Sequence, residues 1–287
     1  MKITNKLAKG KTFSFEVFPP KEGNPLEPLL ETLNQLYRFK PDFISCTYGA
    51  GGSNAGRNFE ICKAVMKSGH DIVSHFTCIG GSRAEIVETI DRYAAAGIEN
   101  VLALRGDLPE GWEGTRGDFA HADELLAFLR EKYPSLCLGA GACPEKHIEA
   151  ESFDSDIQYL KSKQDKGAEF IMTQLCHDAD AFAVYLERIR KANITLPVIV
   201  GIMPVLLRDA TIRMAVTNGC SVPRQLAEVI GKYYNASPED FKKAGKEFTV
   251  KQIKRFIDTG VEGIHIYSLN KHEDITDILL AAGYKTA

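Results

Sequence analysis

The sequence predicts a single (β/α)8 barrel of the TIM type spanning residues 1–287, with extra helices in the seventh strand-to-helix connection. Short β-branched or aromatic runs alternate with segments of helical periodicity along the chain, a pattern typical of parallel βα units. Eight such runs occur, which is the number of strands that closes this barrel. A chain of 287 residues is also an ordinary length for a β/α barrel that folds as one domain.

The predicted strands cover residues 13–18, 43–48, 72–78, 100–106, 137–143, 170–176, 197–203 and 263–269. Between them, apolar residues recur at spacings of three and four, as expected of helices that pack on a sheet. Gly97, Gly167 and Gly260 each lie between a helical pattern and the next strand, where a left-handed cap is needed. The seventh connection, 206–258, is long and contains two prolines, so we expect two or three helices there. A doubly wound open sheet is disfavoured, because FPPKEG follows the first strand in place of a GxGxxG turn.

Composition and charge narrow the class of partner. The net charge of -3, with acidic and basic residues mixed, gives no basic stripe for nucleic acid and no polybasic membrane anchor. Residues 1–11 lack the apolar run of a signal peptide, and no later segment is apolar enough to span a bilayer, so a cytoplasmic protein is expected. The 7 cysteines include no CxxC, so reduced thiols and no metal are expected, although a site shared with another subunit stays open. A small-molecule partner is therefore favoured.

Polar residues at the carboxyl ends of the predicted strands are the first candidates for chemistry, because catalytic residues of β/α barrels lie there. In the first strand, Glu16 stands between aromatic residues within FSFEVFPP. Burial among them would raise the pKa of its carboxyl toward a value useful for proton donation. The alternative is an acid at the barrel rim that is paired or exposed to water.

The second and third strands also end in polar residues. Thr47 and Tyr48 run into GAGGS, whose glycines would let backbone amides approach an anionic or planar ligand. The alternative is a flexible turn, since the loop lacks the Lys-Ser/Thr ending of a Walker motif. His75 ends the third strand and is either a ligand contact or a core histidine with satisfied hydrogen bonds.

Further polar groups end the fourth, sixth and eighth strands. Arg105 and Asp107 flank a glycine, so the cation could clamp a phosphate or carbonyl and the acid could act on a bound ring. The alternative is an ion pair between these two residues. Gln174 can donate to and accept from the edge of a heterocycle, and Tyr267 ends the last strand. Together these residues indicate an enzyme that binds a planar, phosphate-bearing ligand.

Eight motifs in chain order give the sequence a resemblance to methylenetetrahydrofolate reductases, in their short bacterial form. They are SFEVFPPK, DFISCTYGAGGS, SHFTC, NVLALRGD, PEKH, MTQL, GIMP and HIYSLNK. The resemblance implies non-covalent FAD, electrons from NADH or NADPH, and ping-pong reduction of methylenetetrahydrofolate to 5-methyltetrahydrofolate. It also implies a place in one-carbon metabolism and methionine biosynthesis.

The resemblance implies residue roles as well. Glu16 would be the proton donor that opens the folate ring, and Asp107 would lie near flavin and folate and tune both. The implied cofactor contacts are Thr47, His75, Arg105, Gly106, Asp107, His121, His147, Asp156 and Lys163. The implied substrate contacts are Glu16, Gln174, Tyr267 and Lys271.

Three positions depart from the family pattern. Cys143 replaces an aromatic residue before the PE of the fifth motif, and His121 replaces a tyrosine that stacks on adenine. Arg208, or Leu207 if the alignment shifts, replaces an aromatic residue that packs on folate. These changes bear on flavin contacts, substrate packing and the electron donor.

The main alternative function is the same flavoprotein acting as the catalytic subunit of a larger complex. Ferredoxin, or a partner flavin or iron–sulfur subunit, would then supply the electrons, so both a homo-oligomer and a subunit of an electron-transfer complex are expected assemblies. A non-enzymatic accessory subunit is disfavoured by the presence of Glu16, Asp107 and Gln174 together. A Schiff-base aldolase is disfavoured because no predicted strand contains a lysine.

Overall fold

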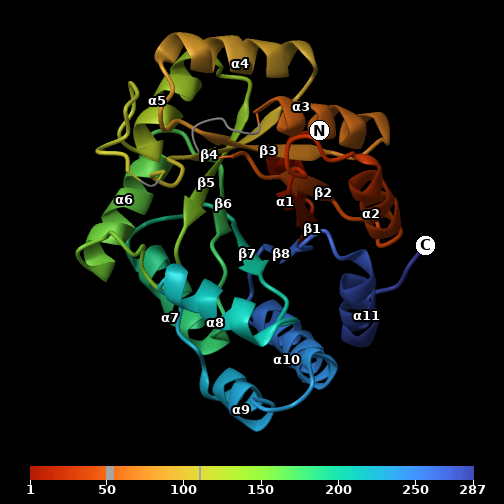
Figure 1. The fold of residues 1–287 in the computed structure, drawn as a ribbon. Helices are drawn as coiled ribbons and strands as arrows, with labels where there is room; N and C mark the ends of the chain where they lie inside the picture. The colour runs from red at the N-terminus through yellow and green to blue at the C-terminus, as the bar shows by residue number, and fades with distance from the viewer. Residues whose placement is uncertain (50–54, 110) are drawn as a thin grey trace.

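The structure, a computed structural model, describes residues 1–49, 55–109 and 111–287. Its strands are all parallel and close into a barrel in chain order, with the last strand paired to the first (Figure 1). The strands are β1 (Thr12–Val17), β2 (Phe43–Cys46), β3 (Ile72–Thr77), β4 (Asn100–Leu104), β5 (Cys137–Ala142), β6 (Phe170–Thr173), β7 (Val198–Ile202) and β8 (Gly263–Tyr267). The predicted fold class is confirmed.

Each predicted run contains one strand, but the predicted carboxyl ends were too long. The run 43–48 ends as a strand at Cys46, and the run 170–176 ends at Thr173. The residues beyond these points leave the ladder of backbone hydrogen bonds and begin the loops above the barrel. Several of them turn toward a cavity there, which is why polar residues follow the apolar core of each strand.

Helices surround the barrel on its outside (Figure 1). They are α1 (Ile3–Leu7), α2 (Glu27–Tyr37), α3 (Ala55–Lys67), α4 (Arg83–Ala95), α5 (Ala122–Lys132), α6 (Phe153–Asp165), α7 (Ala179–Lys191), α8 (Arg208–Thr217), α9 (Arg224–Lys232), α10 (Pro238–Asp258) and α11 (His272–Ala282). The seventh connection holds α8, α9 and α10, within the predicted two or three helices. Gly97, Gly167 and Gly260 have φ of 83°, 102° and 85°, so these glycines adopt the predicted left-handed conformation. No helix in the described ranges is long and apolar enough to cross a membrane.

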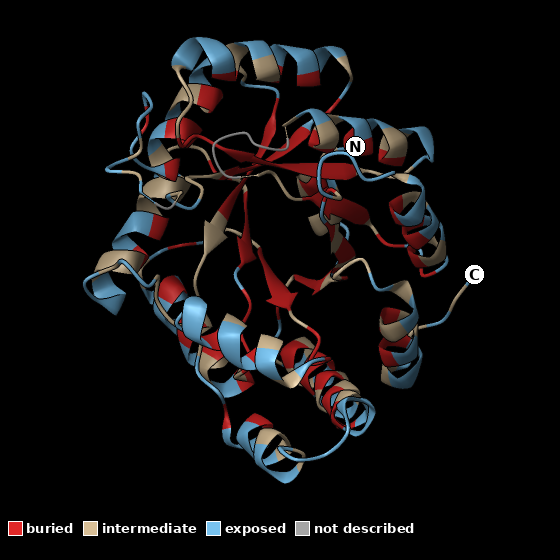
Figure 2. Cartoon of the chain, in the orientation of Figure 1, coloured by how far each residue is buried: buried red, intermediate tan, exposed pale blue. Residues whose placement is uncertain are grey.

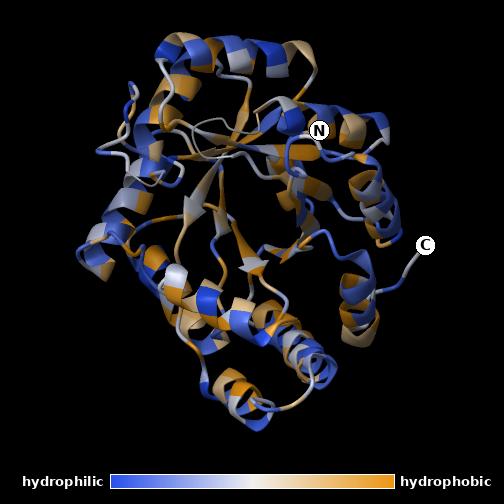
Figure 3. Cartoon of the chain, viewed as in Figure 1, coloured by the Kyte–Doolittle hydropathy of each residue, from blue (hydrophilic) through white to orange (hydrophobic). Residues whose placement is uncertain are grey.

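Two apolar layers hold the barrel together. The larger lies between the strands and the helices, so the strands are almost entirely buried while the helices expose one face (Figure 2). Hydrophobic residues accordingly concentrate on the strands, and hydrophilic residues on the outer helix faces (Figure 3). The smaller layer fills the barrel interior and consists of Ile3, Phe43, Val73, Leu102, Cys137, Phe170, Met172 and Ile199. Ile3 belongs to α1, and its backbone amide donates to Asn100 Oδ1 at 2.9 Å.

Strand alternation on β1 separates its aromatic residues from its acid. Phe15 is fully buried in the layer beneath the helices, whereas Ser14 and Glu16 face the barrel interior. Phe18 lies beyond the strand and is 42% exposed. The aromatic neighbours of Glu16 in sequence therefore do not surround its carboxyl, and other groups determine its environment.

Candidate active site

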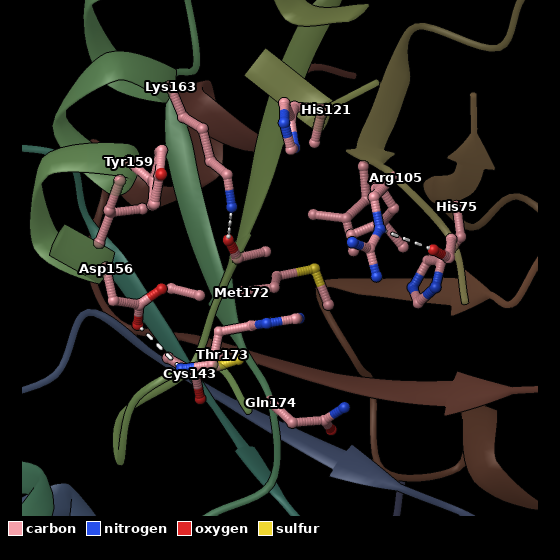
Figure 4. Close-up of a pocket in the computed structure, with 18 of the residues that line it drawn as sticks. His75, Arg105, His121, Cys143, Asp156, Tyr159, Lys163, Met172, Thr173 and Gln174 are labelled. Carbon is pink, nitrogen blue, oxygen red and sulfur yellow. Dashed lines mark hydrogen bonds between the residues drawn. The ribbon is translucent and has the colours of Figure 1, made fainter. Parts of the chain in front are cut away.

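A cavity of about 550 Å³ lies at the carboxyl ends of the strands. Every site residue expected from the sequence lines it, except Lys271. Those residues come from β1, β3 and β8 and from the loops and helices that follow the strands. Figure 4 shows labelled residues of this cavity projecting from several different strands and from one flanking helix.

Glu16 lies on the cavity wall with its side chain 17% exposed. Its Oε2 is 3.5 Å from His75 Nε2 and 3.7 Å from His265 Nε2, and its carboxyl makes no hydrogen bond within the described part of the chain. Burial raises the pKa of Glu16, and the neighbouring His75 opposes the rise. Burial also lowers the pKa of His75, so burial works against the charged form of both neighbours.

His75 and Thr77 present unsatisfied polar atoms to the cavity. Both residues are 8% exposed, and His75 Nε2 and Thr77 Oγ1 have no hydrogen-bond partner among the described residues. Buried polar atoms are normally hydrogen-bonded, because an unsatisfied one costs about 1–3 kcal/mol. Two such atoms beside one cavity indicate that a ligand supplies the missing partners. Of the two interpretations of His75, this arrangement favours the ligand contact.

At the end of β4, Arg105 forms a bidentate ion pair with Glu149. Its two terminal nitrogens lie 2.5 and 2.9 Å from the carboxylate oxygens, while Nε donates to the carbonyl of Gly106 at 3.1 Å. The alternative ion pair between Arg105 and Asp107 is not formed. Asp107 is instead exposed on the cavity wall.

At Gly106 the backbone packs closely against the side chains of Ile79 and Thr77 beside the cavity. The φ of Gly106 is 93°, and an added Cβ would lie 2.7 Å from Ile79 and 3.0 Å from Thr77. Only glycine fits this position without strain and displacement.

The helix α6 brings three site residues to the cavity. Asp156, Tyr159 and Lys163 are spaced by three and four residues, so they lie along one face of the helix. Asp156 accepts from the backbone amide of His147 at 3.1 Å, and Lys163 Nζ donates to the carbonyl of Gly141 at 2.8 Å (Figure 4). Burial lowers the pKa of Lys163, which forms no ion pair within the described residues.

His121 and Tyr159 form an open aromatic pair. His121 is the N-cap residue of α5, and its ring lies 6.5 Å from the Tyr159 ring with 22° between their planes. Because stacked rings approach to about 3.5 Å, this separation is close to that needed for a planar group between the two rings. Both residues line the cavity.

Gln174 follows β6 and Tyr267 ends β8, and both residues line the cavity but differ in their hydrogen bonds. Gln174 is exposed, and its Oε1 accepts from the amide of Leu175 at 2.9 Å, which leaves its NH₂ group directed elsewhere. Tyr267 donates its hydroxyl to the carbonyl of Thr173 at 2.9 Å. Gly201 makes this possible, since a Cβ there would lie 2.4 Å from the Tyr267 hydroxyl.

The remaining residues singled out in the sequence lie partly inside and partly outside the cavity. Thr47 and Cys143 line the cavity, and burial raises the pKa of the Cys143 thiol to about 11. Lys271 is exposed beyond β8, and Arg208 packs over the Tyr234 ring at 4.8 Å, outside the cavity lining. The greater part of the GAGGS loop lies outside the described residues.

Sequence reasoning missed Thr77, Glu149 and Tyr159. Thr77 alternates with His75 along β3, so strand periodicity could have identified it. Tyr159 lies between Asp156 and Lys163 at helical spacing, which is also a readable signal. Glu149 gives no such signal, because a loop brings it to Arg105.

Metal ligation has no support in residues 1–49, 55–109 and 111–287. No group of three or more His, Cys, Asp or Glu side chains there is arranged to hold a metal ion, and all the cysteines are free.

Comparison with known proteins decides the family. The family model for methylenetetrahydrofolate reductase matches residues 2–283. This chain belongs to the methylenetetrahydrofolate reductase family. A 5,10-methylenetetrahydrofolate reductase of Pectobacterium carotovorum is 33% identical over 261 residues, which cover 91% of this chain and 86% of that protein.

Longer relatives and a solved structure agree with the family and the fold. Methylenetetrahydrofolate reductase (NADH) 1 of Arabidopsis thaliana is 33% identical over 99% of this chain but only 51% of its own length. The chain thus spans about half the length of the first curated relatives it matches. A Clostridium thermocellum protein, whose structure is described as binding two copies of 5-methyl-5,6,7,8-tetrahydrofolic acid, has the same fold. Its TM-score is 0.65 at 16% identity, with 98% of both chains covered.

Proposed function

We propose that this chain reduces methylenetetrahydrofolate to 5-methyltetrahydrofolate with FAD as its cofactor, in a ping-pong cycle that starts from NADH or NADPH. The observation that carries the proposal is that one cavity brings together the buried Glu16 carboxyl and the polar side chains that follow several strands of the barrel. Family membership supports the choice of folate as substrate.

The residues present fit FAD better than a smaller flavin. His75 Nε2 and Thr77 Oγ1 line the cavity and have no hydrogen-bond partner among the described residues, so they are available to polar atoms of the cofactor. Arg105 and Lys163 are cations suited to a diphosphate, and the His121–Tyr159 pair is spaced to take a planar base such as adenine. When bound, FAD would supply the hydride chemistry.

The protein's own contribution is orientation and proton transfer. Gln174 has a free NH₂ group with which to hold the edge of a heterocycle. Asp107 places a negative charge on the cavity wall where it acts on a bound ring. Burial raises the pKa of the Glu16 carboxyl, which suits this group to donate a proton to the folate nitrogen as the five-membered ring opens.

The proposal is tested by an anaerobic titration of the purified chain reconstituted with FAD. The visible flavin absorbance should disappear on addition of NADH or NADPH and return on addition of methylenetetrahydrofolate. If neither NADH nor NADPH reduces the flavin, but methylenetetrahydrofolate still reoxidises flavin that has been reduced chemically, the complex-subunit alternative is favoured. Failure to rebind FAD or to react with folate would overturn the proposal.

A further inference from the structure

His265 lies in the barrel interior directly below the Glu16 carboxyl. It belongs to β8, is 1% exposed, and stacks on Phe43 with ring centroids 6.0 Å apart. Its Nδ1 is 2.7 Å from Ser14 Oγ and its Nε2 is 3.0 Å from Ser45 Oγ. The same Nε2 is the atom that faces Glu16 Oε2 at 3.7 Å.

The hydrogen-bond network selects one tautomer of this ring. Ser14 Oγ also lies 3.3 Å from the carbonyl of Ile264, which can only accept. If Ser14 donates to that carbonyl, Nδ1–H donates to Ser14 and Ser45 donates to Nε2, so every polar atom is used. In the opposite tautomer the Ser14 hydroxyl must donate to Nδ1, so it cannot donate to the Ile264 carbonyl. The Ser45 hydroxyl then accepts from Nε2–H, and its own hydrogen no longer bonds to the ring. The first arrangement makes more hydrogen bonds and places an unprotonated Nε2 toward Glu16.

The tautomer determines how the ring acts on the carboxyl. An unprotonated ring nitrogen carries partial negative charge and disfavours a carboxylate nearby, whereas an N–H would favour it. The other titratable groups near Glu16 are His75 on β3 and Tyr267 on β8, which line the same cavity, and Cys46 on β2, which packs in the layer beneath the helices. Burial lowers the pKa of His265 to about 3, so its ring stays neutral through the physiological range.

We propose that His265 is a positioning residue that, held by Ser14 and Ser45 as the Nδ1–H tautomer, keeps the Glu16 carboxyl protonated. This inference rests on the proposed role of Glu16 as proton donor. It adds that two buried serines outside the cavity lining control the protonation of the acid.

The two serines give opposite predictions. In Ser14→Ala the Nδ1–H loses its acceptor, so the ring changes to the Nε2–H tautomer, stabilises the carboxylate, and lowers the titration midpoint of Glu16 by about one pH unit. In Ser45→Ala the Nδ1–H bond to Ser14 remains, so the midpoint stays in place or rises. Ser74→Ala is the matched control, because Ser74 is a buried strand serine bonded to Asn58, away from His265.

The experiment is NMR of the flavin-free chain labelled with ¹⁵N-histidine and ¹³C-glutamate, with Glu16→Gln and His265→Asn used for assignment. The expected result is an unprotonated Nε2 in the wild type and a lowered Glu16 midpoint in Ser14→Ala only. A protonated Nε2 in the wild type, or an unmoved midpoint in a folded Ser14→Ala protein, overturns the proposal. If Ser14→Ala does not fold, the wild-type tautomer together with Ser45→Ala decides: a lowered midpoint in the latter overturns it.

The pH profile of the folate half-reaction separates this proposal from the proposed function. Its midpoint should fall in Ser14→Ala by the same shift as the NMR midpoint, whereas a purely structural role would change the rate without moving the profile. If Ser14→Ala lowers the NMR midpoint of Glu16 while Glu16→Gln still reacts normally with folate, His265 controls the protonation of Glu16 but Glu16 is not the proton donor.

Discussion

Arg105 and Glu149 form a bidentate ion pair across the cavity mouth, with terminal nitrogens 2.5 and 2.9 Å from the carboxylate oxygens. The pair joins the loop after β4 to the loop after β5. It occupies both ends of the guanidinium fork that we assign to the FAD diphosphate, so Glu149 competes with the cofactor for Arg105.

Replacing Glu149 with Gln should therefore tighten FAD binding. Removing this charge frees Arg105 and reduces repulsion of an anionic ligand, so the dissociation constant should fall by about threefold, and more at low salt. Fluorescence titration of the flavin-free protein measures it. Weaker binding would mean that Glu149 orients Arg105 for the cofactor.

Replacing Tyr159 with Ala should weaken FAD binding by about fivefold to tenfold, because one face of the proposed adenine site is lost. FMN binding should be unaffected, since FMN carries no adenine. Tyr159→Phe is the control and should retain the affinity for FAD. Equal losses for both flavins would place the adenine elsewhere.

The sequence predicted the barrel well because its strands are apolar runs with clear helices between them. It also identified residues that line the cavity: strand-end positions such as Glu16 and His75 follow from the strand order of this fold, and helix positions such as Asp156 and Lys163 follow from the family resemblance. It failed where loops decide contacts: Arg105 pairs with Glu149 and not with Asp107. Alternation along β1 turns Phe15 away from Glu16, as strand periodicity predicts, but the sequence did not indicate that β8 supplies His265 as a neighbour.

Replacing Asp107 with Asn should keep the fold and the cofactor but make the flavin easier to reduce. A negative charge near the flavin opposes the addition of electrons, so its removal should raise the reduction potential by roughly 30 mV. Folate turnover should fall about tenfold, because the same charge supports the reacting folate ring. Spectroelectrochemistry and steady-state assays check both. Unchanged potential and turnover would place Asp107 outside the site.

His177 predicts a pH dependence of stability. It is 2% exposed, neither ring nitrogen has a partner within the described residues, and burial lowers its pKa to about 4. Between its unfolded pKa of about 6.5 and that value the unfolded state binds the extra proton, so stability falls as pH falls, by about 1.4 kcal/mol per pH unit.

Replacing His177 with Phe should remove this contribution to the pH dependence of stability. The variant should be more stable at pH 7 by about 1 kcal/mol, because no buried nitrogen is left unsatisfied. Its advantage should grow by about 2 kcal/mol between pH 7 and pH 5. Urea unfolding at both pH values measures the difference. An advantage that does not change with pH would show that folding leaves the pKa of His177 unshifted.

The role of Glu16 is tested most directly by stopped-flow kinetics of Glu16→Gln, following each half-reaction separately under anaerobic conditions. The amide preserves size and hydrogen bonding but carries no acidic proton. Reduction of the flavin by its electron donor should stay within a small factor of wild type, whereas reoxidation by methylenetetrahydrofolate should slow by at least about 100-fold. Reoxidation at nearly the wild-type rate would contradict the assignment of Glu16 as proton donor, and loss of both half-reactions together would make its role structural.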